Sequence, residues 1–558
     1  MAAPPSKRVR LAHLEHFRRK VPHVSASALS AVLLEAKESG IPDLHDRRDF
    51  REARDAVLDE ATPYGPIYQS VDVPIHAPRK RQHLQVIHPL AFLYLLLSTC
   101  VNFSNYVESI HAAHPSSAAS PWGLVLYSDE VTPGNQLAMD NKRKIQAVYF
   151  SFLEFGASLG SEDLWLTLTA KRSSAVNEIP GGMSQVFGMI LKLFFVAHAF
   201  HEIGCEFKLT SGRTIRIYAK LKVFLQDGGA HKITWHCKGD SGHKFCLLCR
   251  NVFSKRSELA DVDDDGDMMC DIIRAEDLDI ATDEELIESA RRVHHFHGID
   301  DDKTFKARQI ANGFSYTPYN MLCDPTLDGL VYPASQFMHD WMHCIFVSGV
   351  WNITTCLVFK ALHGAGVRDV YALAYEYVSR WHWPKRIKQN KLEELFTPSR
   401  RDANNEAKKF KCQASQGLSV YGVLGLFFNL FPGLCDAQIK VYQTLCDLID
   451  CFSCVQRERG LITPKILLQR VHAFLNAFVT GFSANIMTPK FHWLLHFPSY
   501  LRRFGWLLAC FVHERKHKML KRYCNDIRNT AVFEHSVLRE VYQQCCSREL
   551  FDQYQLNF

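Results

Sequence analysis

Three acidic residues are placed where they could bind metal ions together. Asp129 closes an apolar run that begins at Leu124, and Asp227 closes a second one that begins at Leu221. Glu514 comes much later, in a helix-like segment. Two divalent ions about 3.5 to 4 Å apart can stabilise the attacking and leaving oxygens of a phosphodiester, and hard Mg²⁺ prefers carboxylate ligands. If the three acids converge in space, we expect metal-dependent phosphodiester chemistry.

Basic residues surround Glu514 in the sequence. A carboxylate among cations is suited to meet a phosphate backbone together with its metal. The candidate DNA contacts in this segment are Arg515, Lys516, Lys518, Lys521 and Arg522. The same residues also fit an amphipathic basic helix with a pair between Glu514 and Lys518, and spacing alone does not choose between the two interpretations.

Cysteine and histidine residues form a second candidate metal site. Cys246 and Cys249 have the Cys-x2-Cys spacing of structural zinc, and Cys237 precedes them. His339 and His343, at i and i+4, would share one helical face and could complete that site or line the catalytic cleft. A buried reduced cysteine pair is the alternative for the thiols. For the histidines it is a helix N-terminal cap with two packed, hydrogen-bonded rings.

The elements that must position these residues follow from residue patterns. Runs rich in β-branched and aromatic residues, separated by Gly, Pro, Asn and Ser, are typical of strands. We expect strands at residues 122–131, 143–155, 163–170 and 221–226, a helix at 183–200, and a hairpin around Ser211 and Gly212. Three strands, a helix and a further strand, with acids ending the first and last, resemble the order of an RNase H-like core.

Composition bounds the class of protein. The chain has 558 residues, 47% of them hydrophobic and 22% charged, which suits a large globular protein of more than one lobe. The net charge of +6 is too mild to demonstrate a nucleic-acid partner. Eighteen scattered cysteines with no secretory-type leader indicate a reducing compartment. No apolar run reaches the ~20 residues of a membrane span, so we expect a soluble protein.

The chain divides into six expected regions. A basic and helical N-terminal region is followed by the first part of the core, an acidic linker, a helical insertion that reads as long apolar-periodic segments, a final helix that carries Glu514, and a tail. The expected boundaries are residues 1–110, 120–250, 251–300, 301–485, 486–530 and 531–558. The basic tract at residues 1–20 fits an import signal, a phosphate-contacting arm or a solvated terminus.

In their order, the motifs over residues 120–530 resemble the transposase domain of cut-and-paste DNA elements, of the DDE type. The resemblance is closest to the CACTA (EnSpm) and Kyakuja-Dileera-Zisupton groups. The matching motifs are Tyr127-Ser128-Asp129-Glu130, Gly134-Asn135-Gln136-Leu137, Asp227 with Gly239-Asp240-Ser241-Gly242, Cys246-Leu247-Leu248-Cys249, Asp340-Trp341-Met342-His343, His492 with His496, and Phe511-Val512-His513-Glu514-Arg515-Lys516-His517.

This resemblance implies an α/β fold, an RNase H-like mixed-sheet catalytic core interrupted by a large all-helical insertion. It implies that Asp129, Asp227 and Glu514 hold Mg²⁺ or Mn²⁺, and that the protein cleaves double-stranded DNA at element ends and joins the freed 3′-hydroxyl to a target. Nuclear localisation and a homo-oligomer would suit that function. The Cys-x2-Cys and Asp-x2-His motifs resemble secondary signatures of these groups, with a structural role and a possible zinc ion.

Two alternatives remain open from the sequence. No zinc-finger or helix-turn-helix pattern precedes residue 120, so recognition of specific element ends has no evident module. The chain could therefore be a catalytically inactive, transposon-derived nucleic-acid-binding protein. An unrelated helical scaffold with coincidental acids is the third interpretation, and a five-stranded sheet of the RNase H type would exclude it.

Overall fold

The computed structural model describes residues 26–43, 48–49, 52, 56, 61–75, 82–134, 143–239, 242–253, 273–527 and 532–546. The chain divides into two compact units, Met1–Glu60 and Ala61–Phe558. The first unit contains helix α2, Ala26–Ser39. The basic tract at residues 1–20 lies outside the described residues. So do parts of the transposase-like motifs, at residues 135–137 and 240–241, and residues 254–272 of the expected acidic linker.

A five-stranded mixed sheet forms the centre of the second unit. Its spatial order is β11-β10-β5-β6-β7. Strand β6 is antiparallel to both β5 and β7, whereas β10 is parallel to β5 and β11 is parallel to β10. The strand bounds are β5 Trp122–Val131, β6 Ile145–Phe152, β7 Leu166–Arg172, β10 Ala219–Gln226 and β11 Phe337–His339. The protein is therefore of the mixed α/β class.

The central strands are buried on both faces, which explains their nearly continuous apolar sequences. Every residue of β6 is buried, and β5 is buried from Trp122 to Ser128 before Asp129 becomes partly exposed. All four strands expected in the sheet are present, with ends shifted by a few residues. The expected hairpin around Gly212 is also present, as β8 Cys205–Lys208 and β9 Thr214–Ile217.

The fifth strand lies within residues 301–485, where we expected a helical insertion, so that interpretation was wrong at residues 337–339. Phe337–His339 pairs with β10. Helix α11 then spans Trp341–Phe346, and α12 begins at Val350 and ends at Gly364. At the turn between these helices, a Cβ on Gly349 would lie 2.2 Å from the carbonyl oxygen of Cys344, so only glycine fits there. A short apolar strand cannot be told from a helical turn by periodicity alone.

Elements before and around the sheet position its edges. Strand β7 contacts the β3–β4 hairpin, because Thr169 Oγ1 donates to the carbonyl of Gln85 and Lys171 Nζ to that of His83. Residues 61–110 therefore include strands as well as the expected helices. The bounds are β1 Ala61–Thr62, β2 Gly65–Pro66, β3 Tyr68–Val73, β4 Gln82–Ile87, α4 Pro89–Thr99, α5 Val101–Ala113, α6 Ser173–Asn177, α7 Gly182–Leu191 with a π turn at Lys192–Val196, and α8 Gly228–Trp235.

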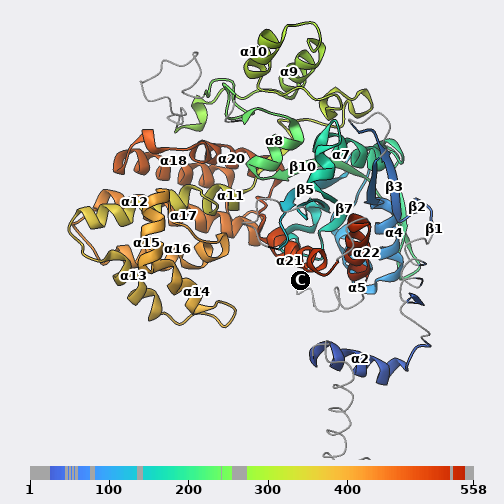
Figure 1. The fold of residues 1–558 in the computed structure, drawn as a ribbon, viewed down its shortest axis with the longest axis horizontal. Coiled ribbons are helices and arrows are strands. Elements are labelled where there is room, and N and C mark those ends of the chain that lie inside the picture. The colour runs from blue at the N-terminus through green and yellow to red at the C-terminus, as the bar shows by residue number, and fades with distance from the viewer. Residues whose placement is uncertain are drawn as a thin grey trace, which may run out of the picture. The chain divides into compact units, whose positions relative to one another are not determined.

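The remainder of the second unit is helical among the described residues. Helices α12 to α18 gather beside the sheet, and α21 returns to pack against β5 (Figure 1). Part of the expected acidic linker is helix α9. The bounds are α9 Asp283–His295, α10 Asp302–Asn312, α13 Val370–Ser379, α14 Gln389–Glu393, α15 Pro398–Ala407, α16 Ala414–Phe428, α17 Asp436–Arg457, α18 Pro464–Gly481, α19 Pro489–Trp493, α20 Phe497–Phe504, α21 Phe511–Asp526 and α22 Phe533–Cys546.

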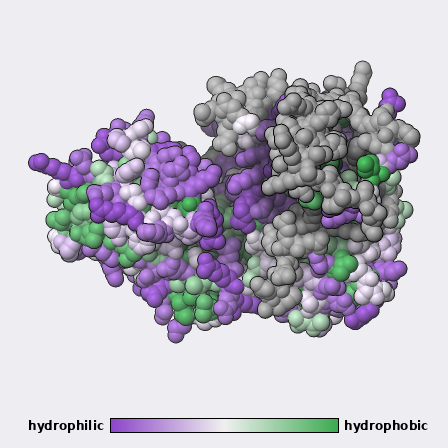
Figure 2. All heavy atoms as spheres, turned by 90° about the horizontal axis from the view of Figure 1, so that it is seen from below, coloured by the Kyte–Doolittle hydropathy of each residue, from purple (hydrophilic) through white to green (hydrophobic). Residues whose placement is uncertain are grey.

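One helical stretch, Trp341–Gly364, is long and apolar enough to cross a membrane by length and composition. Within its most apolar window, 67% of the stretch is buried inside the protein. A bent pair, α4 with α5, passes the same test only as a broken span. The buried core helices of many proteins meet the same criteria, so one or two such helices are weak evidence for a membrane span. Figure 2 shows hydrophilic surface interrupted by small hydrophobic patches on the face that it presents.

Candidate functional site

Asp129 and Asp227 lie next to each other at one edge of the sheet. Strands β5 and β10 are parallel, and their register pairs Tyr127 with Leu225, so the two acids follow at equivalent positions. Gln226 and Ser128, the residues just before the acids, are joined because the Gln226 amide donates to Ser128 Oγ at 3.0 Å. Parallel neighbours are about 4.8 Å apart. The predicted convergence of these two acids is therefore present in the backbone.

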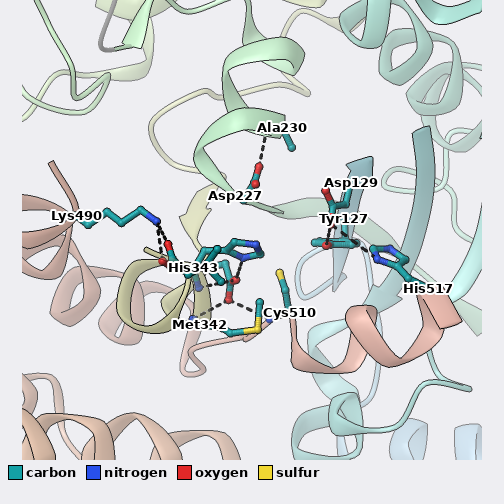
Figure 3. Close-up of polar contacts among 11 residues, drawn as sticks. Tyr127, Asp129, Asp227, Ala230, Met342, His343, Lys490, Cys510 and His517 are labelled. Atoms are coloured by element: carbon teal, nitrogen blue, oxygen red, sulfur yellow. Dashed lines mark hydrogen bonds and ion pairs between the residues drawn. The ribbon is translucent and has the colours of Figure 1, made fainter. Parts of the chain in front are cut away.

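Both carboxylates also have local partners. Asp227 caps helix α8, with Oδ1 accepting the amide of Ala230 at 2.6 Å. Asp129 Oδ2 accepts the hydroxyl of Tyr127 at 3.0 Å, and Oδ1 accepts the amide of Glu130 at 2.7 Å. These contacts fix the orientation of both side chains at the strand ends (Figure 3).

Helix α21 brings Glu514 to Asp129 from far along the chain. One ligand atom from each of Asp129, Glu514 and His517 lies within 4.8 Å of the others, a grouping that could hold a metal ion. Asp227 is outside this group but close enough to affect the charge of Asp129. From the sequence we expected Asp129 and Glu514 to bind metal, whereas His517 appeared only within a motif and had no expected role.

The electrostatics of Asp129 indicate a site with more negative than positive charge. Burial, followed by the negative charges of Asp227 and Glu514, raises the pKa of Asp129 to about 7, even though His343 and the hydrogen bond from Tyr127 oppose that rise. A carboxylate held among other acids is normally neutralised by protonation or by a bound cation. The cluster therefore has the charge distribution of an acceptor for a divalent cation.

His343 lies beside the acids rather than in a zinc site. Burial alone would lower the pKa of His343, but the charge and hydrogen bond of Asp340, followed by Asp227 and Asp129, raise it to about 9. Nδ1 of His343 contacts the Asp340 carboxylate, and Figure 3 shows the ring on the side of Asp227. An imidazolium here is a positive charge that lowers the pKa of Asp129.

Asp340 connects the sheet to the helix that carries Glu514. It caps α11 by accepting the amides of Met342 at 3.0 Å and His343 at 3.1 Å. Its Oδ1 also accepts the amide of Cys510, directly before α21, at 3.0 Å. A helix N-terminal cap, the alternative that we gave for the histidine pair, is therefore present and is formed by Asp340. This buried carboxylate sets where α21 begins and so where Glu514 lies relative to Asp129.

A second candidate metal centre is a buried cluster of two cysteines and two histidines. Cys246, Cys249, His492 and His496 each offer one ligand atom within 4.8 Å of the others. Cys246 Sγ is 3.4 Å from His496 Nε2, Cys249 Sγ is 3.4 Å from His492 Nε2, and the two Nε2 atoms are 3.2 Å apart. All four side chains are at least 97% buried.

These separations match tetrahedral zinc. With Zn–S bonds of about 2.3 Å and Zn–N bonds of about 2.0 to 2.1 Å, tetrahedral angles place sulfur and nitrogen about 3.6 Å apart and two nitrogens about 3.4 Å apart. Burial by itself would raise the pKa of Cys246, but Cys249, His496 and His492 hold it well below its usual range. The pair therefore favours a thiolate, the form that binds zinc. The residues fit a structural zinc ion.

The ligand set expected for this zinc was wrong in three members. Cys237 pairs as an isolated β-bridge with Phe314. His339 belongs to strand β11, where its Nδ1 contacts the Tyr500 hydroxyl at 2.8 Å. His343 faces the acids. Because Asp340 ends the strand and begins the helix, His339 and His343 do not share a helical face. The histidines that do join the cysteine cluster are His492 and His496, and their i, i+4 spacing was the sequence pattern that could have indicated them.

The basic residues of α21 fall into two groups. Lys516 is only 4% exposed and donates to the carbonyl of Glu162, so the expectation that it contacts DNA was wrong. Arg515 forms an ion pair with Glu162 and donates to the carbonyl of Gly160, contacts that hold α21 against the segment after β6. Lys518 and Arg522 are exposed and Lys521 is half-buried, and these three stay predicted DNA contacts.

Comparison with known proteins gives no family assignment, because no family model matches the chain and no curated protein matches it. The fold and the two clusters define a mixed α/β protein with a carboxylate cluster at the ends of two inner strands and a buried Cys2His2 cluster.

Proposed function

We propose that this protein is a DNA transposase or a transposase-derived nuclease. It would cleave phosphodiester bonds of double-stranded DNA with Mg²⁺ or Mn²⁺ and transfer the freed strand. The observation that carries the proposal is the meeting of Asp129 with Asp227 on the adjacent strand and with Glu514 on a remote helix. The sequence places these acids in three separate regions, and convergence on one sheet edge is what a metal-dependent nuclease requires.

The strand order supports an RNase H-like core. In chain order the five strands of the sheet are arranged 3-2-1-4-5, with the second antiparallel to the first and the fourth parallel to it. The helical region between β11 and α21 takes the place of the insertion expected in the CACTA and Kyakuja-Dileera-Zisupton groups. The two acids lie near the end of the first strand and directly after the fourth, as the resemblance to these groups implies.

The carboxylates would hold the divalent ions through oxygen ligands. When bound, such ions polarise the phosphodiester and activate the attacking water or 3′-hydroxyl. Asp129, between Asp227 and Glu514, would contribute to both sides of the site. His343 would place a positive charge beside the acids, and Asp340 would position both His343 and the start of α21.

The Cys2His2 cluster would bind a structural zinc ion. Cys246 and Cys249 lie shortly after Asp227, while His492 and His496 lie in the segment that leads to Glu514. One zinc would therefore join the segment after the second acid to the segment before the third. With all four positions filled by protein, no site would remain open for a substrate, which is typical of structural zinc.

A cleavage and strand-transfer assay tests the proposed function. The purified protein would be incubated with duplex DNA that contains the sequences flanking its gene, with Mg²⁺, with Mn²⁺ or with EDTA. We expect cleaved and joined products with either metal and none with EDTA, because the acids act through bound metal. DNA binding without cleavage under all metal conditions would contradict the proposal and support the inactive nucleic-acid-binding alternative.

The exposed cations of α21 should contribute to DNA affinity. Changing Lys518, Lys521 and Arg522 to Ala is expected to reduce the slope of log K against log salt by about 2.7, since each phosphate contact contributes about 0.9. Fluorescence anisotropy at several salt concentrations measures the slope. Changing the exposed Lys385, Arg386 and Lys388 to Ala removes the same charge from the helical region. An equal loss of slope in both triple variants would remove α21 as the contact.

A further inference from the structure

We propose that His517 is a metal ligand, with Nδ1 binding the same divalent ion as Asp129 and Glu514. The inference rests on the proposed function and deepens it, since it gives the site one nitrogen donor beside its oxygen donors. The consequence is a selectivity for transition-metal ions such as Mn²⁺ over Mg²⁺ at this position.

The position of His517 carries the inference. Nδ1 of His517 lies 3.9 Å from Oδ2 of Asp129, and Figure 3 shows the ring and the carboxylate directed toward each other. Two ligands of an octahedral ion with bonds of about 2.1 Å are about 3.0 Å apart when adjacent and about 4.2 Å apart when opposite. The separation of 3.9 Å falls between these values, so one ion could bridge the two atoms with a small adjustment.

The helix provides a second reason. Glu514 and His517 are at i and i+3 on α21, so they share one helical face. Helix α21 contacts β5, and one ligand atom of each of these two residues lies within 4.8 Å of a carboxylate oxygen of Asp129. His517 is 2% exposed, and its Nε2 has no hydrogen-bond partner among the described residues. A buried imidazole whose Nδ1 lies beside a carboxylate is suited to bind a cation through Nδ1, shared with that carboxylate.

A purely structural role for the ring is the competing explanation, and His513 separates the two. Both rings belong to one aromatic stack with Tyr127 and Tyr149, and His513 lies 3.6 Å from Tyr127 between centroids. Both nitrogens of His513 are buried without partners among the described residues, and the ring is not part of the Asp129 and Glu514 group. His513 therefore has the surroundings of a packed core ring, while His517 has a carboxylate at one nitrogen.

A nitrogen ligand changes which metal the site prefers. Mg²⁺ requires near-octahedral oxygen coordination and exchanges its water for nitrogen reluctantly. Imidazole suits transition metals, whose affinity for such sites rises from Mn²⁺ through Fe²⁺ to Co²⁺. We therefore expect tighter binding of Mn²⁺ than of Mg²⁺. When His517 is replaced by Asp, the difference between the affinities for the two ions should become smaller.

Pulsed electron paramagnetic resonance of Mn²⁺ bound to the full chain tests the inference directly. We expect nitrogen-14 modulation in the wild type that disappears in His517→Phe and persists in His513→Phe. Both substitutions keep a ring in the stack, so they are matched for packing. Nitrogen modulation that persists in His517→Phe, or is absent from wild-type protein with bound Mn²⁺, would overturn the assignment.

The variants also distinguish this inference from the proposed function. If Mn²⁺ binds through Asp129 but shows oxygen coordination only, the nuclease proposal stands and His517 is a packing residue. If Asp129→Asn leaves Mn²⁺ binding unchanged, the carboxylate site itself is wrong. Should His517→Phe fail to fold, His517→Asp supplies the second measurement. Its ratio of Mn²⁺ to Mg²⁺ dissociation constants should move toward that of an all-oxygen site, and an unchanged ratio counts against the nitrogen ligand.

Discussion

Replacing Asp129 or Asp227 with Asn is expected to reduce metal-dependent DNA cleavage by about 1,000-fold or more. Each carboxylate would hold a divalent ion against the phosphodiester, and the loss of about 4 kcal/mol of transition-state stabilisation corresponds to about three orders of magnitude in rate. Single-turnover cleavage rates with saturating Mg²⁺ and Mn²⁺ measure the effect. The same assay should show a similar loss for Glu514→Gln.

Glu130→Gln is the matched control for these substitutions. Glu130 follows Asp129 on the same strand, but its carboxylate pairs with Lys144 at 3.0 Å and accepts from Ser173 at 2.8 Å, so we expect nearly wild-type cleavage. Retained cleavage in Asp227→Asn would remove that residue from the site. Equal losses in Glu130→Gln and Asp129→Asn would indicate a general disturbance of the strand end.

Protein stability separates lost chemistry from lost folding in this series. The raised pKa of Asp129, about 7, means that the folded protein binds this proton more tightly than the unfolded chain. In metal-free protein, stability from this group is full at low pH and is lost as pH rises from about 4 through 7. Asn at this position carries no charge, so it avoids the free-energy cost of a buried carboxylate at high pH. The Tm of metal-free Asp129→Asn at pH 7.5 should therefore equal or exceed that of the wild type.

Loss of the buried zinc site is the second large effect that we expect. Purified protein should contain one zinc per chain, and changing both Cys246 and Cys249 to Ser should remove it. The free energy of unfolding should fall by about 3 to 4 kcal/mol, the stabilisation given by a ligand at about 100 to 1,000 times its dissociation constant. Metal analysis and thermal unfolding measure the two quantities. Cleavage should fall as well, because the zinc would join the segments around Asp227 and Glu514.

Cys237→Ser is the control for the zinc prediction. Cys237 is buried and belongs to the same region, and burial raises the pKa of its thiol, but it is not among the four clustered residues. We expect this variant to retain its zinc. A His492→Ala, His496→Ala variant should lose zinc as the cysteine pair does. Zinc-free wild-type protein that is fully folded would refute the site.

Strand positions could be predicted from the sequence because burial on both faces leaves a nearly continuous apolar run. That pattern located β5, β6, β7 and β10, and with them Asp129, two residues before the end of β5, and Asp227, directly after β10. The short β11 could not be found in this way. Its three buried residues merge with the apolar helices that follow, and only pairing with β10 makes them a strand.

The candidate metal ligands, like the strands, could be predicted only in part from the sequence. The Cys-x2-Cys spacing identified Cys246 and Cys249 because both thiols come from one short loop. Their partners are more than 240 positions away in the chain, and a single sequence carries no signal that relates His492 and His496 to that loop. His339 and His343 had equally suitable spacing, but the backbone changes from strand to helix between them.

The sequence by itself determined the chemical types available and the strand ends that carry Asp129 and Asp227, because local residue patterns specify strands and their limits. Only the tertiary structure decided that Glu514 and His517 meet Asp129, that Lys516 is buried, and that His343 faces the acids rather than the cysteines. These outcomes depend on how α21 packs on β5 and begins at the residue held by Asp340. Long-range packing of this kind results from burial and shape over the whole core, which local spacing does not encode.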